Sequence, residues 1–378
     1  MTPRRASRPF GTVEAAALGL TIGYALGQLR FLSEWLRVPA VAAARAPDPG
    51  EWTALIAARD EAGSIARAVA SVREQVAEVV VVDDHSADAT AERARRAGAR
   101  VETLPPGASG KQAALAVGMR SARTSWVAML DADAAAPARW IGALEASAVG
   151  GAVAVAGPVL LAPARTWFER WQALDFCGMM AITAASLWRG GFAMGNGANL
   201  AVRREAFAAV GGYGLPTDAR AAASGDDLLL VAKLMRRYPG RVAFAKTREA
   251  AVATPPSHTL RAFVRQRWRW AAKTSLAREP TRTATLAAAW AFHLGLLAGL
   301  PLAAAGKLDR RVLAAAWLAK AGVDLALLRS AARFFGRAHL LDASYPAQSV
   351  AHAAYVAGIG TLALLPLDYE WKGRRHRV

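Results

Sequence analysis

The sequence is poor in cysteine and in acidic side chains, and both shortages limit what the protein can be. Cys177 is the only cysteine, so the chain forms neither an intramolecular disulfide nor a cysteine-based metal cluster. Asp and Glu number 29 against 47 Lys and Arg, which leaves a formal net charge of +18. A surplus of this size attracts nucleic acid or anionic lipid headgroups, and charge alone does not choose between them.

Signatures of nucleic-acid-binding modules are also missing. The sequence has no zinc-finger cysteine spacing, no aromatic sheet signature and no heptad repeat. Apolar residues, in contrast, make up 54% of the chain, and the mean hydropathy is +0.19, which is unusual for a soluble enzyme. The composition therefore favours a membrane protein that has no nucleic-acid partner and that contacts an anionic lipid surface.

Three stretches have the composition of a membrane-spanning helix, which needs about 20 mainly apolar residues. Residues 10–29 contain one charge, Glu14, whereas residues 284–305 and 347–367 contain none. A fourth stretch, residues 312–328, is shorter and contains two charges. The sequence therefore predicts an N-terminal anchor and two or three C-terminal spans.

The charges of the fourth stretch are Lys320 and Asp324. Their i,i+4 spacing would let them pair on a helix and lower the cost of burial. The predicted organisation is an N-terminal anchor at residues 1–45, a catalytic domain at 50–280, C-terminal transmembrane helices at 281–370 and a basic tail at 371–378.

The N-terminal stretch has features of both a cleaved signal and an anchor. Basic residues precede it and small residues follow at 42–44, as in a signal peptide. However, a cleavage site lies just past the apolar run, and here Arg30, Glu34 and Arg37 intervene. We expect an uncleaved anchor. Its orientation is not given by the positive-inside rule, because both ends of the stretch are basic.

Between residues 52 and 155, short apolar runs alternate with amphipathic helical ones, which predicts βα units and a parallel sheet. The runs are continuously apolar, as expected when helices cover both faces of a sheet. The fold class is therefore α/β and Rossmann-like. The expected strands are residues 53–58, 79–82, 100–104, 126–130 and 152–156, and the expected helices are 61–73, 87–97, 111–122 and 137–149, the last with Pro137 in its first turn.

Polar clusters follow three of these strands. Ligands of open parallel sheets bind at the carboxyl ends of the strands, so the clusters would face one rim. They consist of Arg59, Asp60 and Glu61 after the first strand, Asp83, Asp84, His85 and Ser86 after the second, and Asp131 and Asp133 after the fourth.

The last two clusters differ in what they indicate. Asp83, Asp84 and Ser86 suit helix capping and turns as well as binding, so both roles remain open. Asp131 and Asp133 leave a strand at positions i and i+2, where two carboxylates can share a hard cation. Mg²⁺ and Mn²⁺ take such oxygen ligands and are commonly completed by diphosphate oxygens.

Polar motifs continue in order through the second half of the chain. The ordered set resembles the inverting family-two glycosyltransferases with the GT-A nucleotide-sugar fold, and its last motif fits the Gln-x-x-Arg-Trp pattern of the membrane-bound branch. The matching segments are residues 81–90, 110–111, 131–133, 195–199, 203–207, 211–213, 224–227 and 266–270.

The resemblance implies donor-binding roles at the matching positions. Asp83 or Asp84 would bind the nucleotide base, with Arg59 and Glu61 nearby. The ribose and a divalent metal, Mg²⁺ or Mn²⁺, would be held by Asp131 and Asp133, and the leaving diphosphate by Lys111 and Arg269.

It also implies which residues act on the acceptor. Asp227 would be the general base, and Asp226 stands where the family usually has Glu, so the two could divide their roles differently. Gln266, Arg269 and Trp270 would bind the diphosphate and line the acceptor entrance. The loop containing Asn196 and Asn199 is either a tight turn or a surface that closely approaches the sugar.

The function expected from this resemblance is transfer of one sugar, with inversion, to a lipid or lipid-linked acceptor. The catalytic domain would face the cytoplasm, where the nucleotide-sugar donor is held. A processive polysaccharide synthase also carries Gln-x-x-Arg-Trp but generally has more membrane helices. Two further alternatives are a nucleotidyltransferase and an inactive, membrane-tethered binding protein, although every expected acidic position is occupied by an acid.

Overall fold

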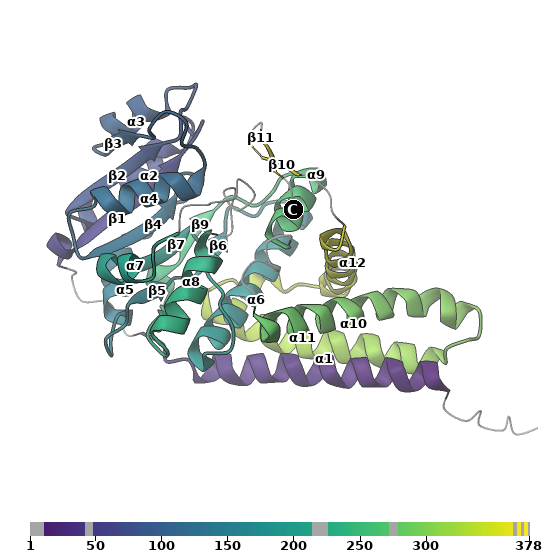
Figure 1. The fold of residues 1–378 in the computed structure, drawn as a ribbon. Coiled ribbons are helices and arrows are strands. Elements are labelled where there is room, and N and C mark those ends of the chain that lie inside the picture. Colours follow the sequence, from purple (N-terminus) through teal and green to yellow (C-terminus); the bar gives the residue numbers. More distant parts are fainter. Residues whose placement is uncertain are drawn as a thin grey trace, which may run out of the picture.

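A computed structural model of the protein describes residues 11–41, 48–213, 226–271, 279–365, 369–371 and 374–376. It consists of an α/β domain joined to a layer of long helices (Figure 1). The α/β fold with a central, mostly parallel sheet confirms the predicted fold class.

The central sheet has seven strands in the order β3-β2-β1-β4-β7-β5-β8. The first four in this order pair in parallel, whereas β7 runs antiparallel to both of its neighbours, a reversal that the sequence did not predict. The strands are β1 Trp52–Ala58, β2 Glu78–Asp83, β3 Arg100–Thr103, β4 Trp126–Asp131, β5 Ala154–Ala156, β7 Asn199–Arg203 and β8 Val242–Phe244.

Helices cover both faces of this sheet, which explains the continuously apolar strands. In β1, Leu55 packs in a core with residues of α4 and α6, and Ala54 and Ile56 pack in a second core with residues of α2, α3 and α5. The helices of the domain are α2 Ile65–Val72, α3 Thr90–Arg96, α4 Lys111–Ser121, α5 Trp140–Ser147, α6 Trp167–Arg189, α7 Arg204–Ala209, α8 Asp226–Arg237 and α9 Leu260–Ala271.

The four predicted helices of the first half are present but shorter than expected. Pro137 in particular precedes α5, which begins at Trp140, so its placement in the first turn was wrong. Its carbonyl oxygen instead accepts hydrogen bonds from Trp140 N at 3.1 Å and Gln75 Nε2 at 2.9 Å. A side chain outside the segment therefore fixes this turn, and local sequence rules do not anticipate that contact.

Smaller elements complete the chain. Strands β6 Val159–Leu161 and β9 Val252–Thr254 pair in parallel, and β10 Tyr369–Trp371 and β11 Arg374–His376 form an antiparallel hairpin near the C-terminus. Single 3₁₀ turns occupy Pro49–Glu51, Arg73–Gln75, Arg248–Ala250 and Ala338–Leu340.

All four stretches expected in the membrane are helical. Helices α1 Thr12–Arg37, α10 Pro280–Ala304 and α11 Arg310–Phe334 lie side by side, and α12 Tyr345–Ala363 packs against α10 and α9 (Figure 1). Among the described residues, α1 and α10 are long and apolar enough to cross a membrane. Within α11, Lys320 and Asp324 pair at 2.8 Å, as their spacing predicted.

The C-terminal end of α1 belongs to the core of the α/β domain. Trp35 is 1% exposed, and Lys246 Nζ lies 4.1 Å from the centre of its ring. The same ammonium group donates to the carbonyl oxygens of Trp35 at 2.6 Å and Val38 at 2.9 Å. The N-terminal helix is therefore fixed to the domain by a buried aromatic residue and by bonds to its last turn.

We expect Trp35→Ala to destabilise the protein by about 3–5 kcal/mol, because it opens a large cavity and removes the ring beneath Lys246. The neighbouring Leu36, 64% exposed, provides the control: Leu36→Ala should change stability by no more than about 0.5 kcal/mol. Thermal unfolding of both variants in detergent measures this difference. Equal shifts in Tm would contradict the role of Trp35.

Candidate functional site

The carboxyl ends of β1, β2 and β4 bring the predicted polar clusters together at one rim of the sheet. Arg59 Nη1 lies 3.6 Å from Asp84 Oδ2 and donates to the Asp84 carbonyl oxygen at 3.2 Å. Asp84 Oδ2 also accepts from Gly110 N at 2.9 Å. Asp84 thereby fixes both Arg59 and the start of α4, whose first residue is Lys111.

The segment after β2 also holds the loop after β1 in place. Asp60, in the loop after β1, has a left-handed backbone with φ of 52°. Side chains of the segment after β2 accept hydrogen bonds from three successive backbone N–H groups of this loop. The pairs are Asp60 N with Ser86 Oγ at 2.9 Å, Glu61 N with Thr90 Oγ1 at 2.7 Å and Ala62 N with Asp88 Oδ2 at 3.0 Å. These hydrogen bonds fix the loop after β1 and thereby position Glu61.

Asp83 and Asp84 differ in their surroundings. Asp84 lines the cavity described below, and Asp83 is not among the residues of its wall. Asp83 Oδ2 accepts from Ser86 N at 3.2 Å, as a turn residue does. Of the two roles left open by the sequence, turn formation is therefore observed for Asp83, and exposure to the cavity for Asp84.

Three carboxylates and one amine meet at the end of β4. Lys111 Nζ donates to Asp131 Oδ1. Burial, together with the charges of Asp131 and Glu61, raises the pKa of Asp133 to about 6, and Lys111 opposes this shift. A cation would relieve repulsion among these half-buried carboxylates. Within the described part of the chain no group of three or more His, Cys, Asp or Glu side chains is arranged to hold a metal ion, so Asp131 and Asp133 could supply only part of the oxygen ligands that Mg²⁺ or Mn²⁺ takes.

Asp227 lies at the start of α8 and faces the loop before β7. Its Oδ2 accepts from Gly197 N at 2.7 Å, and its Oδ1 accepts from Leu228 N at 2.8 Å. A Cβ atom on Gly197 would lie 3.3 Å from Lys111 Nζ and 3.6 Å from Asp227 Oδ2. Gly197 thus lies beside both Lys111 and Asp227, and a side chain at this position would contact Asp227 and require a small shift of the Lys111 ammonium group.

The two asparagines of this loop have different positions. Asn196 lines the cavity, and its Oδ1 accepts from Ala198 N at 3.0 Å. Asn199 is completely buried: it accepts from Trp140 Nε1 at 2.9 Å and donates to the carbonyl oxygens of Pro158 and Ala250 at 2.7 Å each. The structure therefore does not bring Asn199 to the site; its amide holds strand β7 in place.

Helix α9 contributes Gln266, Arg269 and Trp270 to the cavity wall, but its most buried side chain is one that the sequence did not single out. Arg267 is 2% exposed and pairs with Asp175 at 3.4 Å. Its guanidinium carbon lies between 4.6 and 5.8 Å from the ring centres of four aromatic residues, Phe176, Phe263, Trp270 and Tyr355.

Two parts of the predicted site lie outside the described residues. The segment before α8 that carries Ser224 and Gly225 is one of them, and the side chain of Asp226 is the other. Asp226 is placed only as the first residue of α8, directly before Asp227.

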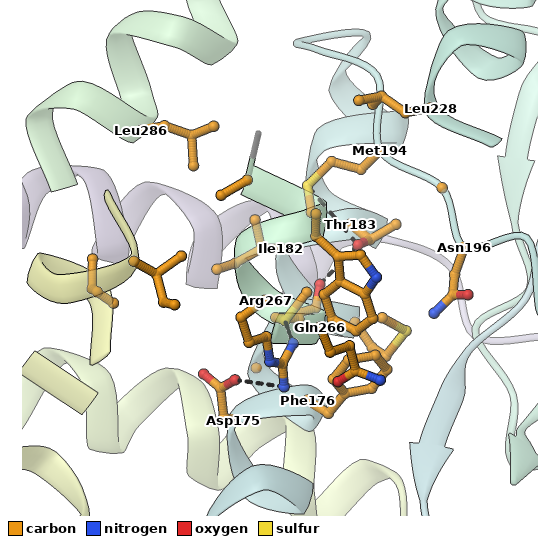
Figure 2. A pocket seen from close by; sticks show the side chains of 18 of the residues that line it. Asp175, Phe176, Ile182, Thr183, Met194, Asn196, Leu228, Gln266, Arg267 and Leu286 are labelled. Carbon is orange, nitrogen blue, oxygen red and sulfur yellow. Dashed lines mark hydrogen bonds and ion pairs between the residues drawn. The ribbon is translucent and has the colours of Figure 1, made fainter. Parts of the chain in front are cut away.

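A single cavity of about 1280 Å³ connects these groups to the long helices. On one side its wall contains Glu61, Lys111, Asp131, Asp133 and Asp227; on the other it contains side chains of α1, α10, α11 and α12. Figure 2 shows Asn196 on one side of the pocket and Leu286 of α10 on the other, with Gln266 and Arg267 between them in this view. The acidic rim and the apolar helices therefore share one space.

The raised pKa of Asp133 gives a prediction for the metal-free protein. Its folded pKa of about 6 exceeds the ordinary 3.8, so the native state loses stability as the pH rises from about 4 to 6. Asp133→Asn removes this cost, and it should stabilise the protein at pH 7 by at most about 3 kcal/mol and only slightly at pH 4.

Thermal unfolding in a chelator from pH 4 to 7.5 measures this gain. Glu92→Gln, an exposed change on α3, is the control and should show no comparable pH-dependent gain. If Asp133→Asn did not stabilise the protein at pH 7, ionised Asp133 would not destabilise the folded state.

Comparison with known proteins agrees with this geometry. Residues 53–211 match the family described as Glycosyl transferase family 2. No match to the sequence was found among curated proteins. Among solved structures, a mannosyltransferase from Pyrobaculum calidifontis in complex with GDP-Man and Mn²⁺ is 24% identical, with a TM-score of 0.57 over 93% of this chain and 96% of that chain.

A glucosyl-3-phosphoglycerate synthase from Mycobacterium tuberculosis is 20% identical, with a TM-score of 0.44 over 61% of this chain and 81% of that chain. At such identities the mannosyltransferase shows a shared fold. The family match covers the strands and loops that build the acidic rim. Residues 53–211 of this chain are therefore similar to glycosyl transferase family 2 in sequence, and the chain shares its fold with the mannosyltransferase.

Proposed function

We propose that the protein is a membrane-anchored, inverting glycosyltransferase that moves one sugar from a nucleotide-sugar donor to a hydroxyl group of a lipid. The observation that carries this proposal is the single cavity shared by the acidic rim of the family 2 domain and the long apolar helices. Such a space allows a charged donor and an apolar acceptor to meet without crossing open water.

The donor end of the cavity has the groups that a nucleoside diphosphate needs. Arg59 and Asp84 would contact the nucleotide, and Lys111 would donate to the diphosphate. A divalent cation held by Asp131 and Asp133 would neutralise charge on the leaving group. Consistent with this assignment, the structurally similar mannosyltransferase was solved with GDP-Man and Mn²⁺.

Asp227 is our general base. An alcohol is a weak nucleophile near neutral pH, so a carboxylate must take its proton as the oxygen attacks the anomeric carbon. The N–H groups of Gly197 and Leu228 hold the two oxygens of Asp227 in fixed positions, and each oxygen retains a lone pair for the proton. A single displacement without a covalent intermediate inverts the anomeric centre.

The leaving diphosphate gains negative charge as the sugar bond breaks. Lys111 currently donates to Asp131, and it lies beside Gly197, close to where the base and the sugar would be. Lys111 can therefore exchange Asp131 for a diphosphate oxygen when the donor binds. Arg269 and Gln266 line the same cavity and would bind the diphosphate from α9.

The long helices that wall the acceptor end have an outer surface suited to contact with lipid. Large apolar side chains are exposed along three of the long helices, among them Leu26 of α1 at 63%, Leu300 of α10 at 51% and Leu318 of α11 at 74%. Exposed apolar surface of this extent is typical of a membrane contact. We place the catalytic domain on the cytoplasmic side, where the donor is available and where basic residues near an anionic leaflet contribute about 1 kcal/mol each.

The test is release of nucleoside diphosphate by the detergent-purified protein, given a panel of nucleotide sugars, Mn²⁺ or Mg²⁺ and a membrane-lipid extract. We expect release with one donor to require both metal and lipid and to produce a lipid heavier by one sugar. Asp227→Asn should bind the donor but lower the rate by a factor of about 10² to 10⁴.

Asp226→Asn is the matched control, because it removes the neighbouring carboxylate from the same helix start. A larger loss in Asp226→Asn than in Asp227→Asn would move the base role to Asp226. If no donor bound and no diphosphate were released under any condition, the proposed activity would be wrong.

A further inference from the structure

The acceptor end of the cavity contains a cluster of polar side chains among the apolar helices. Tyr24 donates to Asp324 Oδ1 at 2.6 Å. Lys320 Nζ donates to Asp324 Oδ2 at 2.8 Å and to the carbonyl oxygen and Oγ of Ser349 at 3.1 Å each. The charges of Lys320 and Asp324 are thus paired, and α1, α11 and α12 are joined by these bonds.

Four polar atoms beside this cluster have no hydrogen-bond partner among the described residues, although they are buried. Every residue that carries one lines the cavity, and Gln348 and His293 are 2% and 1% exposed. The atoms are Gln28 Oε1, His293 Nε2, Gln348 Oε1 and His352 Nδ1. Buried polar groups in native proteins nearly always have a partner, so these atoms are available to bind a molecule that enters the cavity.

The bonds of Gln348 determine which of its amide atoms is left over. Ser344 Oγ donates its only proton to Asp342 Oδ1 at 2.6 Å. It can therefore only accept from Gln348, which places the amide nitrogen at Ser344 at 2.9 Å. The remaining atom of Gln348 is the carbonyl oxygen, an acceptor.

The same reasoning applies to Gln28. The hydroxyl proton of Tyr24 is used in the bond to Asp324, so Tyr24 Oη accepts from Gln28 Nε2 at 2.8 Å. The amide oxygen of Gln28 is the atom left without a partner. Both glutamines therefore present acceptors.

The two histidines present acceptors as well. His293 Nδ1 lies 2.7 Å from the carbonyl oxygen of Ala289, which can only accept, so Nδ1 carries the proton. His352 Nε2 lies 3.6 Å from Asp175 Oδ1, which is too far for a hydrogen bond but close enough for the negative carboxylate to favour the proton on Nε2 rather than on Nδ1. Burial disfavours a doubly protonated ring, so His293 Nε2 and His352 Nδ1 each offer a lone pair.

These atoms are close enough to act together. The rings of His293 and His352 are 5.2 Å apart, and Gln348 precedes His352 by one helical turn on α12, which places both on one face. Tyr24, the partner of Gln28, lies 5.1 Å from His293 between ring centres. We call Gln28, His293, Gln348 and His352 the acceptor array.

We propose that the acceptor array binds hydroxyl groups of the acceptor lipid other than the hydroxyl that receives the sugar. This inference rests on the proposed function and names the class of its substrate, an uncharged lipid with at least two hydroxyl groups. Four lone pairs match O–H donors. They oppose a phosphate, which offers only acceptors to them, and Lys320 in the same cluster opposes a metal cation.

A purely structural role accounts for the paired atoms but not for the array. Polar side chains join helices in membranes by bonding to each other, as Tyr24, Asp324 and Lys320 do here. The four array atoms make no such bond among the described residues, so they add no bond between helices and can accept from donors in the cavity.

The test compares two lipids of the same length that differ only in their donors: 1-O-hexadecylglycerol, with two hydroxyls, and its 2,3-di-O-methyl ether, with none. Binding to the full-length protein in detergent is measured by native mass spectrometry without a nucleotide sugar. We expect the diol to bind about tenfold more tightly, since each hydroxyl bond contributes a few-fold. Equal affinities would overturn the inference.

Two variants assign the preference to the array. Gln348→Met and His293→Phe each remove one acceptor at similar volume, and each should lower the preference for the diol about threefold while leaving affinity for the dimethyl ether unchanged. Leu318→Met, on the exposed surface of α11, is the control and should keep the full preference. A variant that weakened both lipids equally would indicate a structural role and contradict the inference.

Because binding is measured without a donor, the result is separate from the proposed activity. Suppose that no sugar were transferred to any lipid, but that the protein preferred the diol and both variants lost this preference. The binding role of the array would then be supported and the proposed transferase activity contradicted. If sugar were transferred equally to mono-alcohols and diols, and the two bound equally well, the proposed activity would be supported and the proposed binding role of the array would be wrong.

Discussion

Arg267 is a buried charge where the α/β domain meets α12, and its pairing with Asp175 holds two helices of the domain together at that junction. An unpaired buried charge costs several kcal/mol, so α9, which carries Arg267, must stay against α6, which carries Asp175. His352 approaches the same carboxylate from α12. One buried carboxylate thus connects the helix bearing Gln266 and Trp270 to the wall of the acceptor cavity.

The two ends of the cavity differ in chemistry, although adjacent residues of α9 contact both parts of its wall. In α9, Gln266 lines the cavity, and the adjacent Arg267 contacts Asp175 of α6 and Tyr355 of α12. The acidic rim carries an excess of carboxylates, whereas at the far end the charges of Lys320 and Asp324 are paired and the four atoms of the acceptor array are neutral acceptors. Under the proposed function, a donor with several negative charges and a neutral lipid would bind at different ends of the same space.

Much of the fold could be predicted because its signals are local. The apolar runs of β1, β2 and β4 and the carboxylates that follow them lie within about 80 residues, and parallel strands necessarily place such residues at one rim. The reversed strand β7 could not be predicted in this way, since its neighbours β4 and β5 are fixed by packing. The structural role of Asn199 could not be predicted for a similar reason. Its hydrogen-bond partners, Trp140, Pro158 and Ala250, lie in segments distant from it in sequence, so the sequence alone suggested a binding residue.

The site was predictable where residue type dictates chemistry and less so where partners are distant in sequence. Glu61, Lys111, Asp131 and Asp133 lie together as their strand ends implied. The sequence did not point to Arg267 or to the acceptor array. A single arginine among tryptophans forms no motif, and neither do two histidines that lie far apart in the sequence. A lone Asp175 in an apolar helix was the one signal that could have indicated a buried partner.

The central claim is that the lipid enters the cavity beside the acidic rim, and photo-crosslinking tests it most directly. The full-length protein in native-lipid membranes would be treated with a long-chain diol carrying a diazirine, and the labelled residues mapped by peptide mass spectrometry. The account predicts labels at cavity residues such as Ile182 and Leu286, reduced by excess unlabelled diol. Labels confined to outward-facing residues such as Leu26 and Leu318, with no competition, would contradict it.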